Sequence, residues 1–129
     1  MIRGTTAQFK FTMPYPKDEW EWIRIKFWQP NNPSKLLPIT RTKDDCSTTD
    51  DPRELFVSFT AEETARFLDK YKAKVQLRAQ HSLTGAVFGT KQQLITVYPM
   101  LNDIIEEDPT IPPADENRFI IIDGGSIVD

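Results

Sequence analysis

One stretch of the chain, residues 20–28, combines an uninterrupted β-strand pattern with all three tryptophans of the protein. In a strand, successive side chains point to opposite faces. One face of this stretch therefore carries Ile23, Ile25 and Phe27, which suit the core of a sheet. The opposite face carries the three tryptophans interleaved with two cations, namely Trp20, Trp22, Arg24, Lys26 and Trp28. That second face needs a second layer, a partner, or stacking of its own cations on the indoles.

The size and composition of the chain predict one soluble globular domain. Its 129 residues are enough to bury a core, and 39% of them are hydrophobic and 27% charged. No apolar run approaches the roughly 20 residues of a membrane span, so we expect no membrane partner. No apolar run follows the first residues, which predicts that there is no signal peptide. Cys46 is the single cysteine and cannot form an intrachain disulfide, which fits synthesis in a reducing cytoplasm.

Residues 1–105 are expected to form an all-β domain with a minor α component. Alternating patterns between turn signals predict six strands, at residues 3–13, 20–29, 35–42, 53–59, 71–80 and 87–98. Pro38 places the third strand at an edge, and Gly89 suggests a bulge in the last strand. Thr60 and Glu63 match a capping box, which predicts a short crossover helix to about Asp69, with Ala65 and Leu68 facing inward. The pattern favours an immunoglobulin-like antiparallel β-sandwich.

The strand at residues 71–80 shows the cleanest alternation in the chain. Tyr71, Ala73, Val75, Leu77 and Ala79 point one way, and the polar set points the other way. That polar set consists of Lys72, Lys74, Gln76, Arg78 and Gln80. We expect it to form a solvated, cationic outer face.

Residues 106–129 differ from the body in charge and composition. They comprise an acidic, proline-containing linker at 106–117 and a C-terminal extended arm whose apolar side chains are Phe119, Ile120, Ile121, Ile122, Ile127 and Val128. Residues 103–129 carry eight acidic groups and one basic group, whereas residues 1–102 carry 15 basic and 11 acidic groups. A basic body can bind such a tail, its own or a neighbour's, although the tail can also simply be solvated. Because an isolated hairpin is marginal in water, the arm either adds to its own sheet or docks on a neighbouring protein.

The sequence contains no convincing catalytic or metal-binding motif. His81 lies in a predicted turn, where we expect a surface position, and nothing marks a nucleophile beside it. Cys46 has no histidine partner other than His81. The four aspartates of residues 43–53 do not match the spacing of a calcium loop. We therefore expect no enzyme activity, no cofactor and no metal site.

The tryptophan face allows three interpretations. It can be an interface or part of the core, it can stack on sugar rings, or it can take single-stranded nucleic acid. The net charge of −3 and the pI near 5.2 disfavour nucleic acid. We expect no nucleic-acid partner, and a host glycan remains the alternative to a protein partner.

Three segments resemble a known family. They are Arg3-Gly4-Thr5-Thr6 followed by an alternating Phe-Lys-Phe strand, the run from Leu55 through Thr60-Ala61-Glu62-Glu63 to Thr64, and the strand Val75-Gln76-Leu77-Arg78-Ala79. Over residues 2–105 this pattern is similar to small structural virion proteins of phages and prophages of Gram-positive bacteria. The resemblance implies a sandwich like the N-terminal domain of baseplate upper proteins, which anchor receptor-binding proteins. Residues 106–129 depart from that pattern.

The resemblance implies a structural component of a tailed-phage virion, in the tail, the baseplate or a head decoration. Such a protein is made in the bacterial host cytoplasm, is located in the virion, and has other virion proteins and copies of itself as partners. The alternative is a carbohydrate-binding module that contacts the host cell surface. The expected partner-binding residues are Trp20, Trp22, Arg24, Lys26, Trp28, Phe119, Ile120, Ile121, Ile122, Ile127 and Val128.

Overall fold

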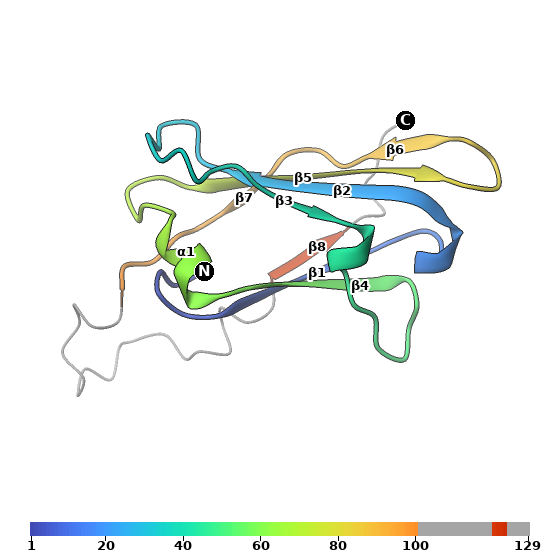
Figure 1. Cartoon of the computed structure of the whole chain (residues 1–129), viewed down its shortest axis with the longest axis horizontal. Helices are drawn as coiled ribbons and strands as arrows, with labels where there is room; N and C mark the ends of the chain where they lie inside the picture. The colour runs from blue at the N-terminus through green and yellow to red at the C-terminus, as the bar shows by residue number, and fades with distance from the viewer. Residues whose placement is uncertain (101–119, 124–129) are drawn as a thin grey trace.

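The computed structural model describes residues 1–100 and 120–123, which form two packed sheets (Figure 1). The three-stranded sheet has the order β4 (Glu54–Phe59), β1 (Ala7–Thr12), β8 (Ile120–Asp123). The five-stranded sheet has the order β3 (Ile39–Thr42), β2 (Trp20–Trp28), β5 (Ala73–His81), β6 (Val87–Gly89), with β7 (Gln93–Ile95) also on β5. Short 3-10 turns at Lys17–Glu19 and Lys43–Asp45 and helix α1 (Ala61–Ala65) complete the fold. The predicted all-β sandwich with one short helix is confirmed.

The core lies between the two sheets and is built from alternate residues of their central strands. Three phenylalanine rings meet at its centre, with ring centroids 5.1 Å apart for Phe9 and Phe27, 4.7 Å for Phe27 and Phe59, and 5.2 Å for Phe9 and Phe59. Each ring is at most 2% exposed. Burying a side chain of this size stabilises the fold by about 1.5–3 kcal/mol. The inward alternation predicted for β1, β2, β4 and β5 therefore supplies most of the core.

Helix α1 begins where the capping box predicted. The Thr60 hydroxyl accepts a hydrogen bond from the Glu63 backbone N–H at 3.2 Å, and the Glu63 carboxylate accepts from the Thr60 N–H at 2.9 Å. The inward face differs from the expectation, because Thr64 and Phe67 are fully buried whereas Ala65 and Leu68 are only partly so.

The Arg3 guanidinium satisfies carbonyl groups at the C-terminal end of the helix. It donates to the carbonyl oxygen of Ala65 at 3.0 Å and to that of Phe67. These carbonyls lie in the last turn, where helical partners run out. Because the chain then tightens, with the Phe67 N–H donating to the Thr64 oxygen, the buried face shifts from the positions that a regular helix predicts.

The strand predicted at residues 87–98 is interrupted and becomes β6 and β7. Thr90 lies in the gap, and its hydroxyl accepts the Leu77 N–H at 2.9 Å while its own N–H donates to the Leu77 carbonyl. The hydroxyl therefore takes the place of a backbone acceptor of the ladder. Pro38 directly precedes β3, which is the edge strand of its sheet as predicted.

Strand β8 pairs with β1 of the same chain. The pairing is parallel and runs from Phe9 opposite Ile120 to Thr12 opposite Asp123. The linker at 106–117 and the arm residues Phe119, Ile127 and Val128 lie outside the described residues. None of the helices within residues 1–100 and 120–123 is long and apolar enough to span a membrane.

Candidate functional site

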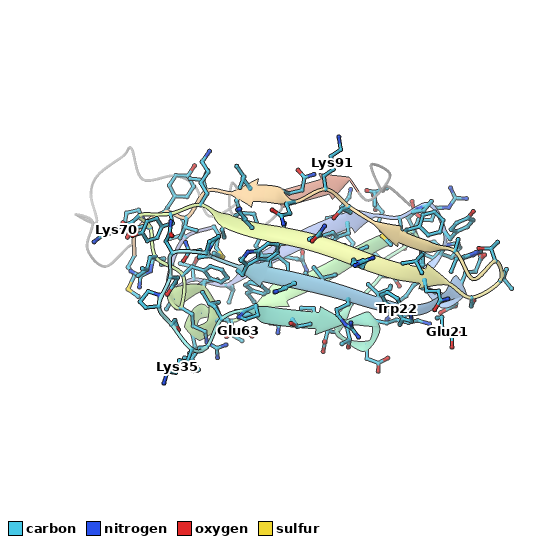
Figure 2. The ribbon with its side chains drawn as sticks, turned by 90° about the horizontal axis from the view of Figure 1, so that it is seen from above. Glu21, Trp22, Lys35, Glu63, Lys70 and Lys91 are labelled. Atoms are coloured by element: carbon cyan, nitrogen blue, oxygen red, sulfur yellow. The ribbon has the colours of Figure 1, made fainter. Side chains whose placement is uncertain are left out.

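The outer face of the five-stranded sheet carries most of the predicted contact residues of β2. Figure 2 looks onto this face, with Trp22 near one end of β2. Along the strand, Arg24 and Lys26 are exposed, and Trp22 and Trp28 are half-buried. These four side chains share one face because the strand alternates regularly from Trp22 onward, with Ile23, Ile25 and Phe27 buried on the other face.

Trp20 does not belong to that outer face, so this part of the prediction is wrong. The pairing with β5 shifts between Trp20 and Trp22, where Glu21 is an extra residue. Such a bulge changes which side of the sheet the preceding residue faces. Trp20 is consequently turned into the core, where it is 1% exposed and its indole N–H donates to the Tyr15 carbonyl at 3.1 Å.

The cations of β2 lie over the two outer indoles. The Arg24 Cζ is 5.6 Å from the Trp22 ring centroid, and the Lys26 Nζ is 5.3 Å from that of Trp28. Both distances lie within the range of a cation–π contact. The Trp22 indole N–H also donates to the Gln80 side-chain oxygen at 2.9 Å. The outer tryptophans are thus engaged by neighbours on their own sheet.

Strand β5 continues this surface with further cations. Across the antiparallel pair, Arg24 lies directly opposite Arg78, and Trp28 lies opposite Lys74. Like charges directly opposite each other in a sheet are destabilising. We call the surface formed by both strands the cationic face; its members are Trp22, Arg24, Lys26, Trp28, Lys74, Gln76, Arg78 and Gln80.

Charge on the cationic face is not neutralised from within the described part of the chain. The four ion pairs found there join Lys10 to Glu54, Arg41 to Glu63, Arg66 to Glu62 and His81 to Glu19. None involves Arg24, Lys26, Lys74 or Arg78. The carboxylate residues Glu21 and Asp44 line a groove with Trp22 and Arg24 at one end of the face.

The hollow on the cationic face is small. It has a volume of about 170 Å³ and is lined by Trp22, Arg24, Lys26, Gln76 and Arg78. Small-molecule sites usually enclose about 300–1,000 Å³. The surface therefore suits the side chains of a macromolecular partner better than an enclosed small ligand.

His81 is the last residue of β5 and is buried, so its predicted surface position is wrong. It is 2% exposed and stacks on Tyr15 at 3.9 Å between ring centroids. Its Nε2 lies 3.1 Å from the Glu19 Oε1, and its Nδ1 lies 3.0 Å from the Thr84 Oγ1. Because both ring nitrogens already have partners, the imidazole is held as a packed core group. The partner that covers it, Tyr15, is distant in sequence and gave no local signal.

Cys46 is buried and has the chemistry of an inert thiol. Burial raises its pKa to about 11, against a lowering by the charge of Lys17. A thiol must ionise to act as a nucleophile, which this environment opposes. In the acidic loop, the hydrogen bond from the Thr42 backbone N–H lowers the pKa of Asp45. No three His, Cys, Asp or Glu side chains within residues 1–100 and 120–123 are grouped as metal ligands would be.

The two predicted contact sets lie on different sheets. Trp22, Arg24, Lys26 and Trp28 belong to the five-stranded sheet, whereas residues 120–122 of the arm form part of β8 in the three-stranded sheet. The structure adds the β5 side chains of the cationic face to the predicted contact residues. The sequence predicts a solvated, cationic surface there and indicates no partner for it. The register that sets Arg24 opposite Arg78 has no signature in the sequence.

Comparisons with protein-family models and with curated proteins find no match to this chain. The geometry of the cationic face and the sequence pattern are therefore the guides to the function of the chain.

Proposed function

We propose that this chain is a non-enzymatic structural component of a tailed-phage virion, in the tail, the baseplate or a head decoration, and that it acts by protein–protein assembly. In this proposal its sandwich is of immunoglobulin-like kind, and its partners are other virion proteins and copies of itself. The observation that carries the proposal is the cationic face, where Arg24 and Arg78 lie opposite each other without an acidic partner in the described residues.

An assembly surface explains the composition of the cationic face. Arg and Trp are enriched at protein interfaces and dominate their energetics. Core packing does not explain why Arg24 and Arg78 lie opposite each other. Simple exposure to water does not explain why Trp22 and Trp28 lie on the outer face. A standard contact buries about 800 Å² of each partner. Two nine-residue strands span only about 30 Å by 10 Å, so the neighbouring strands β3 and β6 of the same sheet must also contribute to it.

The test of this proposal is the protein content of purified particles. Virions are isolated from a phage that carries this sequence, and their proteins are quantified by mass spectrometry. A structural component is present at a fixed number of copies in each particle and resists washing in high salt. Absence from particles that are otherwise complete would contradict the proposal.

The alternative is a carbohydrate-binding module at the host cell surface, which Trp22 and Trp28 favour because sugar rings stack on indoles. One face of each indole is already covered by Arg24 or Lys26. A glycan array probed with the full chain and with Trp22→Ala separates the two functions. Binding that disappears in the variant, while assembly persists, would favour the carbohydrate function.

A further inference from the structure

We propose that the cationic face binds the acidic segment at residues 103–117 of a second copy of this chain. This inference rests on the proposed assembly function and names one of its partners. On this face, Arg24, Lys26, Lys74 and Arg78 have no ion-pair partner among the described residues. Carboxylates placed between Arg24 and Arg78 convert their mutual repulsion into two attractive contacts.

The segment at residues 103–117 has the complementary charge and composition. It contains six acidic residues and no Lys or Arg; the acids are Asp103, Glu106, Glu107, Asp108, Asp115 and Glu116. Three of these are consecutive, and three prolines favour an extended backbone. An extended acidic segment suits a face whose cations are spaced along two strands. Arginine also pairs with carboxylates in a bidentate manner, which favours Arg24 and Arg78 as its main contacts.

The positions of the two ends of this segment favour a second copy over the same chain. Met100 lies beside Gly4, just before β1: a Cβ added to Gly4 would be 3.6 Å from the Met100 Cγ. Ile120 lies beside Phe9 of β1. The segment thus begins near the residues that precede β1 and ends beside β1 itself, whereas the cationic face is the outer surface of the other sheet (Figure 1).

A contact between two different surfaces of the same chain has a consequence for assembly. Such a heterologous contact repeats from copy to copy and produces a ring or a filament. Rings and tubes are the arrangements in which a virion component is used many times. A ring or filament of this kind would place one small chain at several equivalent positions.

Sedimentation velocity of the full chain at 50 mM and 500 mM NaCl tests the inference. We expect self-association at low salt that weakens at high salt, because the Debye screening length falls from about 14 Å at 50 mM to about 4 Å at 500 mM. Arg24→Gln with Arg78→Gln is expected to weaken association roughly 5- to 30-fold, which corresponds to two lost surface ion pairs. The segment variant Glu106→Gln with Glu107→Gln and Asp108→Asn is expected to have an effect of similar size.

A matched control removes the same charge elsewhere. Lys35 and Lys70 are exposed and lie at one end of the molecule, away from the cationic face (Figure 2). Lys35→Gln with Lys70→Gln should leave association unchanged within about twofold. Charge exchange gives the most specific result: Arg24→Glu with Arg78→Glu abolishes association, and adding Glu106→Lys with Glu107→Lys restores it. Circular dichroism melting checks that every variant folds.

The outcomes separate this inference from the proposed function. Rescue by charge exchange supports both. If Arg24→Gln with Arg78→Gln leaves association unchanged, the inference is wrong. It is also wrong if the Lys35 and Lys70 control weakens association equally. In both cases the proposed virion role would still be tested by mass spectrometry of purified particles. A single-stranded oligonucleotide that binds the full chain more tightly than a peptide of residues 103–117 also overturns it.

Discussion

The two faces of β2 show how one strand meets two different requirements. On the inner face, Ile23, Ile25 and Phe27 are at most 2% exposed and fill the space between the sheets. On the outer face, Arg24 and Lys26 are exposed and face like charges or amides of β5. The inner face is explained completely by folding. The outer face includes a repelling pair that folding does not require, which is why we assign a function to it.

The largest expected effect comes from removing a ring from the inner face. Phe27→Ala should lower the free energy of unfolding by about 3–5 kcal/mol, because the cavity lies against Phe9 and Phe59 and cannot collapse. Urea denaturation measures the change. Lys26→Ala, one residue away on the outer face, should stay within about 0.5 kcal/mol. Similar losses for both variants would contradict the assignment of the two faces.

The bulge at Glu21 can be tested with two tryptophans of the same strand. Trp20→Phe should cost about 1–3 kcal/mol, because it leaves the Tyr15 carbonyl without its donor and leaves space beside the Phe88 ring. Trp22→Phe loses an outer hydrogen bond to Gln80 and should cost about 0.5 kcal/mol. Thermal melting of both variants gives the difference, and the reverse order would place Trp20 on the outer face.

The contact between α1 and the edge strand β3 should respond to acid. Burial would raise the pKa of Glu63, but hydrogen bonds from Arg41 and Thr60 outweigh it and the pKa falls below 4.5. A carboxylate with a lowered pKa stabilises the fold above about pH 4.5 and loses this contribution as the pH falls further. Glu63→Gln should therefore cost about 1–2 kcal/mol at pH 7 and much less near pH 3. An equal cost at both pH values in urea titrations would refute this role.

The smallest expected effect has the opposite sign. Arg24→Gln with Arg78→Gln should stabilise the isolated chain by a few tenths of a kcal/mol, because it removes like charges that face each other across the strands. The gain should shrink in high salt, where the repulsion is screened. Differential scanning calorimetry at two salt concentrations resolves it. A clear loss of stability would mean that the pair serves the fold.

Periodicity predicted the strands well where they run without irregularity. The alternation of β1 and β5 and the capping box of α1 are local patterns, and each was found close to its expected position. It did not predict the position of Trp20, because one extra residue reverses which side of a strand faces the core. The burial of His81 and the parallel pairing of β8 depend on contacts between distant segments, which local patterns do not encode.

The candidate site was predictable only in part. Trp22, Arg24, Lys26 and Trp28 follow from the alternation of β2 alone. The contribution of β5 depends on strand neighbours and on register, since a shift of two residues would place Arg78 opposite Trp22 or Lys26 instead of Arg24. A charge pattern in one sequence indicates a cationic surface, but the repelling pair becomes visible only in three dimensions.

The bulge at Glu21 also gives the protein a built-in optical reference. It separates the three indoles of one strand into a shielded one, Trp20, and two at the surface, Trp22 and Trp28. Shielded and solvent-contacting indoles differ in emission wavelength and in their access to a soluble quencher such as acrylamide. Fluorescence of the unmodified chain can therefore report unfolding through Trp20 and occupancy of the outer surface through Trp22 and Trp28, without any added label.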